Sequence, residues 1–442
     1  MKFDELGLIP RILDAIKKEG YTQPSPIQEQ AIPAALVGKD ILGCAQTGTG
    51  KTAAFSIPIL QYLHNNPIDE NLLKLPPSKR ARALILTPTR ELALQIDESI
   101  KAYGRFCKQR ICLLIGGVAQ KPQELAIKQG VDILVATPGR LLDLVWQGVV
   151  DLSNIVLFVL DEADRMLDMG FINDVKRCIE FLPKQKQTMF FTATMPLEIQ
   201  KLAHSLLNNP LNITVTPVSS TVDKIEQVVY KTDKNSKTDL LIYLIEQLDI
   251  KRALIFCRTK HGADRLAQKL HSSKIWASSI HGDKSQGARQ NALGGFKTGR
   301  LKALVATDIA ARGIDIDDLE FVFNYDLPNE PETYVHRIGR TGRAGKNGTA
   351  ISLCDYDELP YLKDIVKLIK KEIPEESNHP YPMTIFTPRP KPQPFKRFPR
   401  LQNQGNHSST HHTTSHNATH HRKNNRNHST MNSHPNKNQV TQ

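Results

Sequence analysis

The stretch DILGCAQTGTGKTAAFSIPILQYL, residues 40–63, decides the fold of this 442-residue chain. An apolar run, a glycine-rich turn and a helix-compatible run follow one another, which is the order of a strand, a phosphate-binding loop and a helix. In such a loop the glycines let backbone N–H groups face phosphate oxygens, Lys51 reaches the β and γ phosphates, and Thr52 ligates magnesium. Ala45 stands where the first glycine is usual. A glycine-rich turn without a ligand is the simpler alternative, and the flanking strand and helix disfavour it.

Short apolar runs recur along the chain between helix-length amphipathic segments. They are ALILTP (83–88), DILVATP (132–138), IVLFVLDE (155–162), TMFFTAT (188–194), ALIFCRT (253–259), KALVATD (302–308) and EFVFNYD (320–326). Apolar strands that alternate with helices indicate an α/β fold with a parallel sheet covered on both faces. Ligands of such sheets bind at the carboxyl ends of the strands, so we expect the functional residues there.

A repeated spacing indicates two copies of one α/β unit. ALIL at 83 and ALIF at 253 are 170 residues apart, and so are LVAT at 134 and LVAT at 304. Between the copies, NNPLNITVTPVSSTVD (208–223) is rich in Pro, Ser, Thr and Asn, which is typical of a linker with one short strand. We therefore expect domain one at 1–210, a linker at 211–223 and domain two at 224–376.

The positive charge of the chain, +13 in total, lies mainly in its last part. Residues 377–442 contain nine Lys or Arg and no Asp or Glu, so residues 1–376 carry 49 − 45, or +4. A Pro-rich basic stretch at 387–400 precedes a tract of Asn, His, Ser and Thr, which predicts a disordered basic tail at 377–442. Its eight histidines after position 400 follow no fixed spacing, which favours a solvated tail over a metal site.

Several classes of protein are excluded by composition. The chain has no apolar stretch near the roughly 20 residues that cross a bilayer, and MKFDELGL lacks the apolar core of a signal peptide. We expect a soluble cytoplasmic protein with no membrane partner. The six cysteines form no CxxC pair, which indicates reduced thiols rather than disulfides or zinc ligands.

Two further motifs complement the phosphate-binding loop. In DEAD (161–164), after the most hydrophobic strand, Asp161 is placed to hold the Mg²⁺ shell and Glu162 to activate the attacking water. Alone, such a tetrad is usually the acidic start of a helix. In HRIGRTGR (336–343), Arg340 and Arg343 are three residues apart and predict one helix face that points into a cleft from domain two. A solvated basic helix is the alternative.

Over about residues 3–370 the chain resembles the DEAD-box ATP-dependent RNA helicases, whose motifs occur in family order. They are GYTQPSPIQ (20–28), AQTGTGKT (45–52), PTRELA (88–93), Gly116-Gly117, TPGR (137–140), DEAD, TAT (192–194), IFCRT (255–259), HGDKSQGAR (281–289), VATDIAARGID (305–315) and HRIGRTGR. The short core and basic tail look most like bacterial RhlE-type members. The resemblance implies two tandem RecA-like domains that use ATP and Mg²⁺.

The resemblance also implies roles for individual residues. For ATP binding it implies Phe3 and Tyr21, the base-reading Gln28, loop residues Ala45, Gln46, Thr47, Gly48, Thr49, Gly50, Lys51 and Thr52, and Asp315, Arg340 and Arg343. For catalysis it implies Lys51, Asp161, Glu162, Arg340 and Arg343, with Mg²⁺ held by Thr52 and Asp161, largely through water. For RNA binding it implies Pro88, Thr89, Arg90, Gly116, Gly117, Thr137, Pro138, Arg140, Arg258, Gln286, Arg289, Thr307 and Asp308. For the coupling of hydrolysis to unwinding it implies Asp164, Thr192, Thr194 and His336.

Two of these residues have a specific expected contact. Phe3 is expected to stack on the adenine base. Thr192 replaces the usual serine of the TAT motif, and its hydroxyl is expected to bond to Asp164.

We therefore expect an RNA-stimulated ATPase that unwinds short RNA duplexes locally, without processive travel, or remodels RNA–protein complexes. The RNA-facing groups are Thr, Arg and backbone N–H groups rather than aromatic rings, so binding should be independent of RNA sequence. An ATP-gated RNA clamp needs the same motifs and stays open as an alternative. A DNA helicase of the same superfamily is disfavoured by Gln28, Phe3 and DEAD. We expect a monomer, with ribosomal or RNA-decay assemblies as possible partners.

Overall fold

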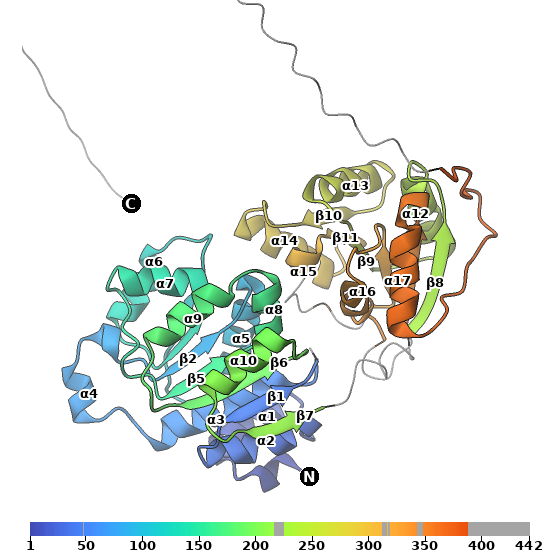
Figure 1. Ribbon diagram of the computed structural model, residues 1–442. Helices are drawn as coiled ribbons and strands as arrows, with labels where there is room; N and C mark the ends of the chain where they lie inside the picture. The colour runs from blue at the N-terminus through green and yellow to red at the C-terminus, as the bar shows by residue number, and fades with distance from the viewer. Residues whose placement is uncertain (47, 216–224, 312–315, 317–318, 343–347, 388–442) are drawn as a thin grey trace, which may run out of the picture. The chain divides into compact units, whose positions relative to one another are not determined.

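The computed structural model describes residues 1–46, 48–215, 225–311, 316, 319–342 and 348–387 (Figure 1). Three predicted site residues, Thr47, Asp315 and Arg343, lie outside the described residues, as do most of the predicted linker and residues 388–442 of the predicted tail.

The first sheet has seven strands, all parallel, in the order β3-β4-β2-β5-β6-β1-β7. The strands are β1 (Ile41–Cys44), β2 (Ala83–Leu86), β3 (Ile111–Leu114), β4 (Ile133–Ala136), β5 (Leu157–Leu160), β6 (Gln187–Thr192) and β7 (Leu211–Thr214). The parallel sheet predicted from the apolar runs is therefore confirmed.

Successive residues of these strands enter different cores, because side chains alternate between the two faces of a sheet. Ile85 and Val159 face one core, whereas Leu84 and Phe158 face the other. The first core is covered by α1 (Pro10–Lys18), α2 (Pro26–Leu36), α3 (Lys51–Asn65) and α5 (Arg90–Tyr103). The second is covered by α6 (Lys121–Lys128), α7 (Pro138–Trp146), α8 (Ala163–Asp168), α9 (Ile172–Glu180) and α10 (Leu197–Leu206). The short helix α4 (Glu70–Lys74) contributes no buried residue.

The second sheet has six strands, again parallel, in the order β10-β11-β9-β12-β13-β8. They are β8 (Ile225–Lys231), β9 (Ala253–Phe256), β10 (Ala277–Ile280), β11 (Ala303–Ala306), β12 (Phe321–Asn324) and β13 (Gly348–Cys354). The 170-residue repeat is visible in the topology: β2 lies between β4 and β5, and its counterpart β9 lies between β11 and β12. The predicted duplication is therefore confirmed.

Helices cover both faces of the second sheet as well. On one face α12 (Lys237–Gln247) and α13 (Lys260–Ser272) pack on β9 and β11. On the other face lie α14 (Gln286–Lys297) and α15 (Asp308–Ala311), next to α16 (Pro331–Ile338) and α17 (Leu359–Ile369). A 3₁₀ turn, η3 (Tyr356–Glu358), joins β13 to α17.

The structure differs from the predicted boundaries in two places. The first sheet continues past residue 210, because β7 pairs with β1 throughout its length. Residues 377–387 pack on domain two: Thr384 donates N–H and O–H hydrogen bonds to Asp233 at 3.0 and 2.5 Å, and the ring centroids of Tyr381 and Tyr243 are 6.3 Å apart. The prediction of disorder from residue 377 is thus wrong for this segment, because its hydroxyl and aromatic groups find partners on the domain.

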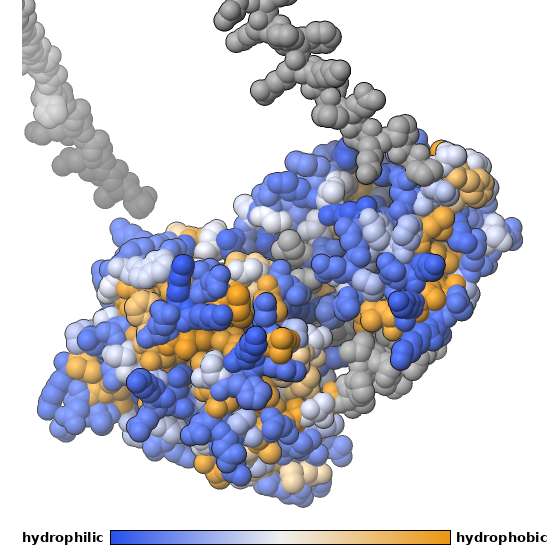
Figure 2. Space-filling view, viewed as in Figure 1, coloured by the Kyte–Doolittle hydropathy of each residue, from blue (hydrophilic) through white to orange (hydrophobic). Residues whose placement is uncertain are grey.

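No helix within the described ranges is long and apolar enough to cross a bilayer. On the face that Figure 2 shows, hydrophobic residues are scattered among hydrophilic ones. All six cysteines are free thiols, four of them buried, as their place in apolar runs predicts.

Candidate functional site

The loops at the carboxyl edge of the first sheet divide the predicted site residues into two groups. Loops after β1, β5 and β6, which are neighbouring strands, carry the predicted ATP and coupling residues. Loops after β2, β3 and β4, also neighbours, carry the predicted RNA residues. Because β2 and β5 pair directly, the two groups meet in the middle of one sheet edge.

The loop after β1 has the backbone that a phosphate-binding turn requires. Gly48 and Gly50 have positive φ, +84° and +94°, and α3 begins at Lys51 immediately afterwards. The Lys51 side chain is 6% exposed, and its Nζ donates to the carbonyl of Ala45 at 2.8 Å. Lys51 is therefore held at the start of the helix, where N–H groups and the helix dipole favour an anion.

Gln28 is bound to this loop directly. Its Nε2 donates to the carbonyl of Gly50 at 3.1 Å, and its Oε1 accepts from the backbone N–H of Ser25 at 3.0 Å. A Cβ on Gly50 would lie 2.3 Å from Gln28 Nε2, so only glycine fits this contact. Among the other two residues predicted for the base, Tyr21 is 47% exposed, whereas Phe3 is 6% exposed within the core. Base stacking by Phe3 stays a prediction.

Replacing Gln28 with alanine is expected to weaken ATP binding by about tenfold, because two hydrogen bonds that shape the loop are lost. Preference for ATP over GTP should fall as well. Nucleotide affinities of Gln28→Ala and of the exposed neighbour Gln30→Ala would check this. Unchanged ATP affinity and unchanged ATP-versus-GTP selectivity in Gln28→Ala would contradict the assignment.

The carboxylate of Asp161 suits a bound cation. Asp161 is 2% exposed, and its Oδ1 has no hydrogen-bond partner among the described residues. Burial raises the pKa of Asp161 to about 7, against the opposing charge of Lys51. A buried oxygen with no partner is the kind of ligand that Mg²⁺ takes, and Thr52 is the second residue of α3. These residues therefore fit the predicted metal.

Glu162 has a strained backbone and a buried partner. Its φ and ψ of 56° and 50° are left-handed, which costs a non-glycine residue about 1–2 kcal/mol and recurs at functional sites. Its Oε2 accepts from Arg165 Nη1 at 2.5 Å, with both side chains largely buried. Arg165 was not among the predicted site residues, although its i, i+3 spacing from Glu162 is a signal for such a pair.

Asp164 joins the DEAD segment to the loop after β6. Its Oδ2 accepts from the N–H groups of Ala193 and Thr194 at 3.2 and 2.8 Å and from Thr194 Oγ1 at 2.9 Å. Although burial opposes its ionisation, Lys51 and the Thr194 hydrogen bonds hold the pKa of Asp164 below its usual range. The predicted bond from Thr192 is wrong: Thr192 ends β6 fully buried, and its hydroxyl donates to the carbonyl of Thr194 at 2.7 Å.

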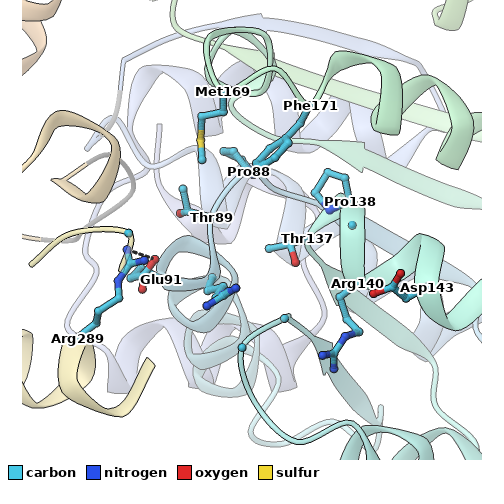
Figure 3. A pocket seen from close by; sticks show the side chains of 15 residues that line it. Pro88, Thr89, Glu91, Thr137, Pro138, Arg140, Asp143, Met169, Phe171 and Arg289 are labelled. Carbon is cyan, nitrogen blue, oxygen red and sulfur yellow. Dashed lines mark ion pairs between the residues drawn. The ribbon is translucent and has the colours of Figure 1, made fainter. Parts of the chain in front are cut away.

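The other half of the edge forms a pocket whose domain-one lining includes Pro88, Thr89, Gly117, Thr137 and Arg140 (Figure 3). Thr89 caps α5 by accepting from Leu92 N–H at 3.2 Å, and Thr137 precedes α7. Buried Nε and Nη1 of Arg140 have no hydrogen-bond partner among the described residues. Helix N-termini and unpaired guanidinium nitrogens are groups that bind phosphate.

The backbone at Gly117 lies close to the side chain of Arg90. Its φ is +73°, and a Cβ at this position would lie 2.1 Å from Arg90 Nη1 and 2.6 Å from Arg90 Cζ. Arg90 begins α5, so the glycine pair after β3 lets a guanidinium from the start of that helix lie across it.

In domain two the predicted RNA residues also follow strands, but several of them form hydrogen bonds or ion pairs with other side chains of the protein. Gln286 and Arg289 lie in the first turn of α14, which Ser285 caps, and Thr307 follows β11. The bidentate partner of Asp308 is Arg337, at 2.6 and 2.8 Å. The guanidinium of Arg258 pairs with Glu358 at 2.6 Å.

The predicted helix through Arg340 is wrong. Helix α16, which carries His336, ends at Ile338, because Gly339 and then Gly342, with φ +68°, turn the chain. Arg340 therefore lies in the turn after the helix, 5% exposed, and the structure describes no helix face shared with Arg343.

Comparison with known proteins decides the family. The model of the DEAD/DEAH box helicases matches residues 25–202, and that of the helicase conserved C-terminal domain matches residues 236–345. The chain is 42% identical to the ATP-dependent RNA helicase CshA of Limosilactobacillus reuteri over 371 residues, which cover 84% of this chain and 72% of the relative. It is equally similar to the DEAD-box ATP-dependent RNA helicase RhpA of Helicobacter pylori (strain ATCC 700392 / 26695), with 42% identity over 84% of this chain and 73% of the relative.

The chain belongs to the DEAD-box helicase family. Among solved structures it resembles S. cerevisiae Dbp5 bound to RNA and ADP BeF3, with a TM-score of 0.74, 35% identity, and coverage of 85% of this chain and 95% of that one. This DEAD-box protein is accordingly an ATP-dependent RNA helicase that hydrolyses ATP and binds RNA. The RhlE-type subgroup stays a prediction.

In this DEAD-box helicase, replacing Gly117 with alanine is expected to weaken RNA binding by about tenfold, because the added Cβ displaces the guanidinium of Arg90. Gly148 is a matched control: its φ is +69° and nothing lies within 4 Å of an added Cβ. Both variants carry the same backbone strain, about 1 kcal/mol, so their unfolding temperatures should fall equally. Equal RNA affinity of Gly117→Ala and Gly148→Ala would contradict the contact.

Proposed function

We propose that this helicase separates short RNA duplexes locally, without processive travel, or remodels RNA–protein complexes. The observation that carries the proposal is the divided carboxyl edge of the first sheet, where ATP-facing loops and RNA-facing loops meet at β2 and β5. Asp164 bonds across the ATP side, from α8 to the loop after β6. A movement of the residues that contact the nucleotide therefore moves groups on the same sheet edge that we propose binds RNA.

On the ATP side, each residue has a proposed part. Lys51 and the N–H groups of the loop bind the β and γ phosphates, while Thr52 and Asp161 hold Mg²⁺, largely through water. When bound, Mg²⁺ supplies positive charge against the phosphate oxygens. Glu162 orients the attacking water and accepts its proton, and its Oε2 is the oxygen paired with Arg165. Asp315, Arg340 and Arg343 act from domain two when the two domains close on ATP and RNA.

On the RNA side, the proposed contacts are to phosphates and sugars. Thr89, Thr137, Arg140 and the backbone at Gly117 offer donors rather than aromatic faces, so they grip one strand without reading its bases. If the closed groove accepts only a bent single strand, closure opens a duplex locally and hydrolysis resets the protein. An RNA clamp that hydrolyses ATP only for release uses the same residues and is the second candidate.

We expect Mg²⁺ to be the metal, the cytoplasm to be the location, and the active form to be a monomer that joins ribosomal or RNA-decay assemblies. We expect the two sheets to act as separate domains, joined by the part of the predicted linker at 211–223 that follows β7.

Truncation after Thr387 is expected to leave the maximal RNA-stimulated ATPase rate unchanged. The removed residues 388–442 carry nine Lys or Arg and no acid, so RNA affinity should fall and its dependence on salt should flatten. RNA titrations of the full and truncated chains at several salt concentrations would check this. An equal salt dependence of the two chains would show that the tail does not contact RNA.

Steady-state ATP hydrolysis with and without single-stranded RNA or DNA tests the proposed function. Stimulation by RNA alone supports an RNA-directed enzyme, and equal stimulation by DNA would favour a DNA helicase. Adding a short RNA duplex under the same conditions separates the two candidates. Strand separation supports remodelling, and RNA retention without separation supports the clamp.

A further inference from the structure

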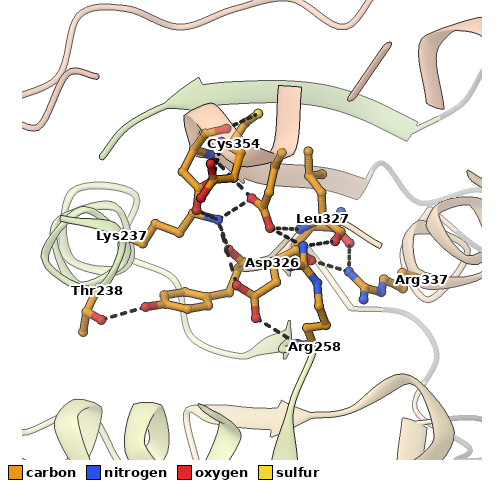
Figure 4. A network of polar contacts seen from close by, with 12 residues as sticks. Lys237, Thr238, Arg258, Asp326, Leu327, Arg337 and Cys354 are labelled. Atoms are coloured by element: carbon orange, nitrogen blue, oxygen red, sulfur yellow. Dashed lines mark hydrogen bonds and ion pairs between the residues drawn. The ribbon is translucent and has the colours of Figure 1, made fainter. Parts of the chain in front are cut away.

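A buried polar network occupies the carboxyl edge of the second sheet (Figure 4). At its centre is Lys237, the first residue of α12, whose side chain is 1% exposed. Its Nζ donates to Glu358 Oε2 at 2.5 Å and to the carbonyl of Tyr325 at 2.9 Å, and it lies 3.5 Å from Asp355 Oδ2. Burying a lysine costs free energy unless its charge is paired, so the ion pair with Glu358 offsets the burial of Lys237.

Glu358 uses its other oxygen for a residue of the proposed RNA site. Glu358 is 2% exposed, and its Oε1 accepts from Arg258 Nη2 at 2.6 Å and from the backbone N–H of Leu327 at 3.2 Å. Arg258 Nη2 also donates to the carbonyl of Leu327 at 2.9 Å. One guanidinium nitrogen thus makes both contacts, while the Arg258 side chain keeps 36% of its surface exposed. Tyr361 lies under the guanidinium, 5.4 Å from its carbon to the ring centroid.

Residues 325–327, which we call the β12 loop, receive contacts from every part of the network. The backbone N–H of Arg258 donates to Asp326 Oδ2 at 2.8 Å. Arg337, on α16, donates to the carbonyl of Asp326 at 2.6 Å and to Asn324 Oδ1 at 3.1 Å. The β12 loop therefore supports both the proposed RNA residue Arg258 and the helix that leads to Arg340.

We propose that Glu358, held by Lys237, is a positioning residue for RNA binding that fixes Arg258 and ties it to the β12 loop. Neither Lys237 nor Glu358 belongs to the motifs that predicted the site. Glu358 also lies beyond the matched C-terminal helicase region, which ends at residue 345. The inference rests on the proposed RNA contact of Arg258.

The charge arrangement explains why a carboxylate is needed at position 358. The exposed part of Arg258 can bind a phosphate only while the guanidinium stays at the sheet edge. Fixing a long arginine side chain there costs much rotamer entropy. The charge-assisted bond from Glu358 supplies that restraint before RNA arrives. Burial raises the pKa of Glu358, and the charge and hydrogen bond of Lys237 oppose this rise.

The experiment measures ATP hydrolysis by the full chain against poly(U) RNA in the variant Lys237→Met with Glu358→Gln, which removes both charges of the pair. We expect the RNA concentration that gives half-maximal stimulation to rise by about tenfold. The matched control is Lys231→Met with Glu375→Gln. This pair is 2.5 Å apart in the same domain, more exposed, and does not touch Arg258.

A thermodynamic cycle separates positioning from general stability. Arg258→Ala alone should raise the half-maximal RNA concentration, and adding Lys237→Met with Glu358→Gln should raise it no further, because the shared contact is already lost. If the double variant does not fold, Glu358→Asp keeps the buried charge but shortens its reach, and it should give a smaller rise that again disappears with Arg258→Ala.

Two results would overturn the inference: an unchanged half-maximal RNA concentration in a folded variant, or a rise that persists in full in the Arg258→Ala background. Failure of the proposed function is distinguishable, because wild type itself would then show no stimulation by RNA.

Discussion

Replacing Glu162 with glutamine is expected to slow ATP turnover by about 10²–10⁴-fold, the contribution of a positioned general base. The amide keeps the size of the side chain but cannot accept a proton from water. Asp161, Lys51 and the loop glycines are untouched, so ATP and RNA should still bind together. Because hydrolysis is the proposed step that releases RNA, the variant should hold RNA longer than wild type when ATP is present.

Single-turnover hydrolysis and RNA dissociation rates measure the two effects of Glu162→Gln separately. Glu180→Gln, an exposed carboxylate at the end of α9, is the matched control and should behave as wild type. Rapid turnover in Glu162→Gln would remove Glu162 from water activation. Slow turnover with wild-type RNA release would instead break the proposed link between hydrolysis and release.

Replacing Arg340 with alanine is expected to lower the maximal rate of RNA-stimulated hydrolysis by about 10³-fold, as loss of an arginine that stabilises the departing phosphate does. ATP binding to domain one should change far less, because Lys51 and Gln28 remain. This difference between rate and binding distinguishes an arginine that acts in the transition state from one that only holds domain two together.

The control for Arg340→Ala is Arg300→Ala. Arg300 is exposed and precedes β11, so it lies at the amino edge of the second sheet, away from the proposed site. Thermal unfolding of both variants checks that domain two is intact. A folded Arg340→Ala enzyme with wild-type turnover would contradict the proposed role.

The parts of the fold and site that depend on local pattern were predictable. Short stretches of sequence encode the phosphate-binding loop, the DEAD segment after β5 and the repeated strands. Strand periodicity and glycine-dependent turns are local properties of the sequence. The prediction of a helix through Arg340 is wrong for a local reason as well, because the glycines that end α16 outweigh the favourable spacing of the arginines.

Contacts between distant segments were beyond sequence reasoning. Lys237 and Glu358 are 121 residues apart, and neither carries a motif that would pair them. The TAT segment offered two hydroxyls for Asp164, and only the three-dimensional course after β6 shows that Thr194 makes the bond while Thr192 turns inward. Burial of Phe3 depends likewise on how the N-terminal segment packs on the first domain.

The separation of RNA duplexes of increasing length by the full chain tests the central claim most directly. Each base-pair step of a nucleic-acid duplex contributes on the order of 1–2 kcal/mol, so local opening can release a duplex of about 10 base pairs but not one of about 20. The proposed local mechanism predicts ATP-dependent separation of the short duplex and a steep loss of rate with length. Separation of both duplexes at similar rates would show processive travel and contradict the mechanism.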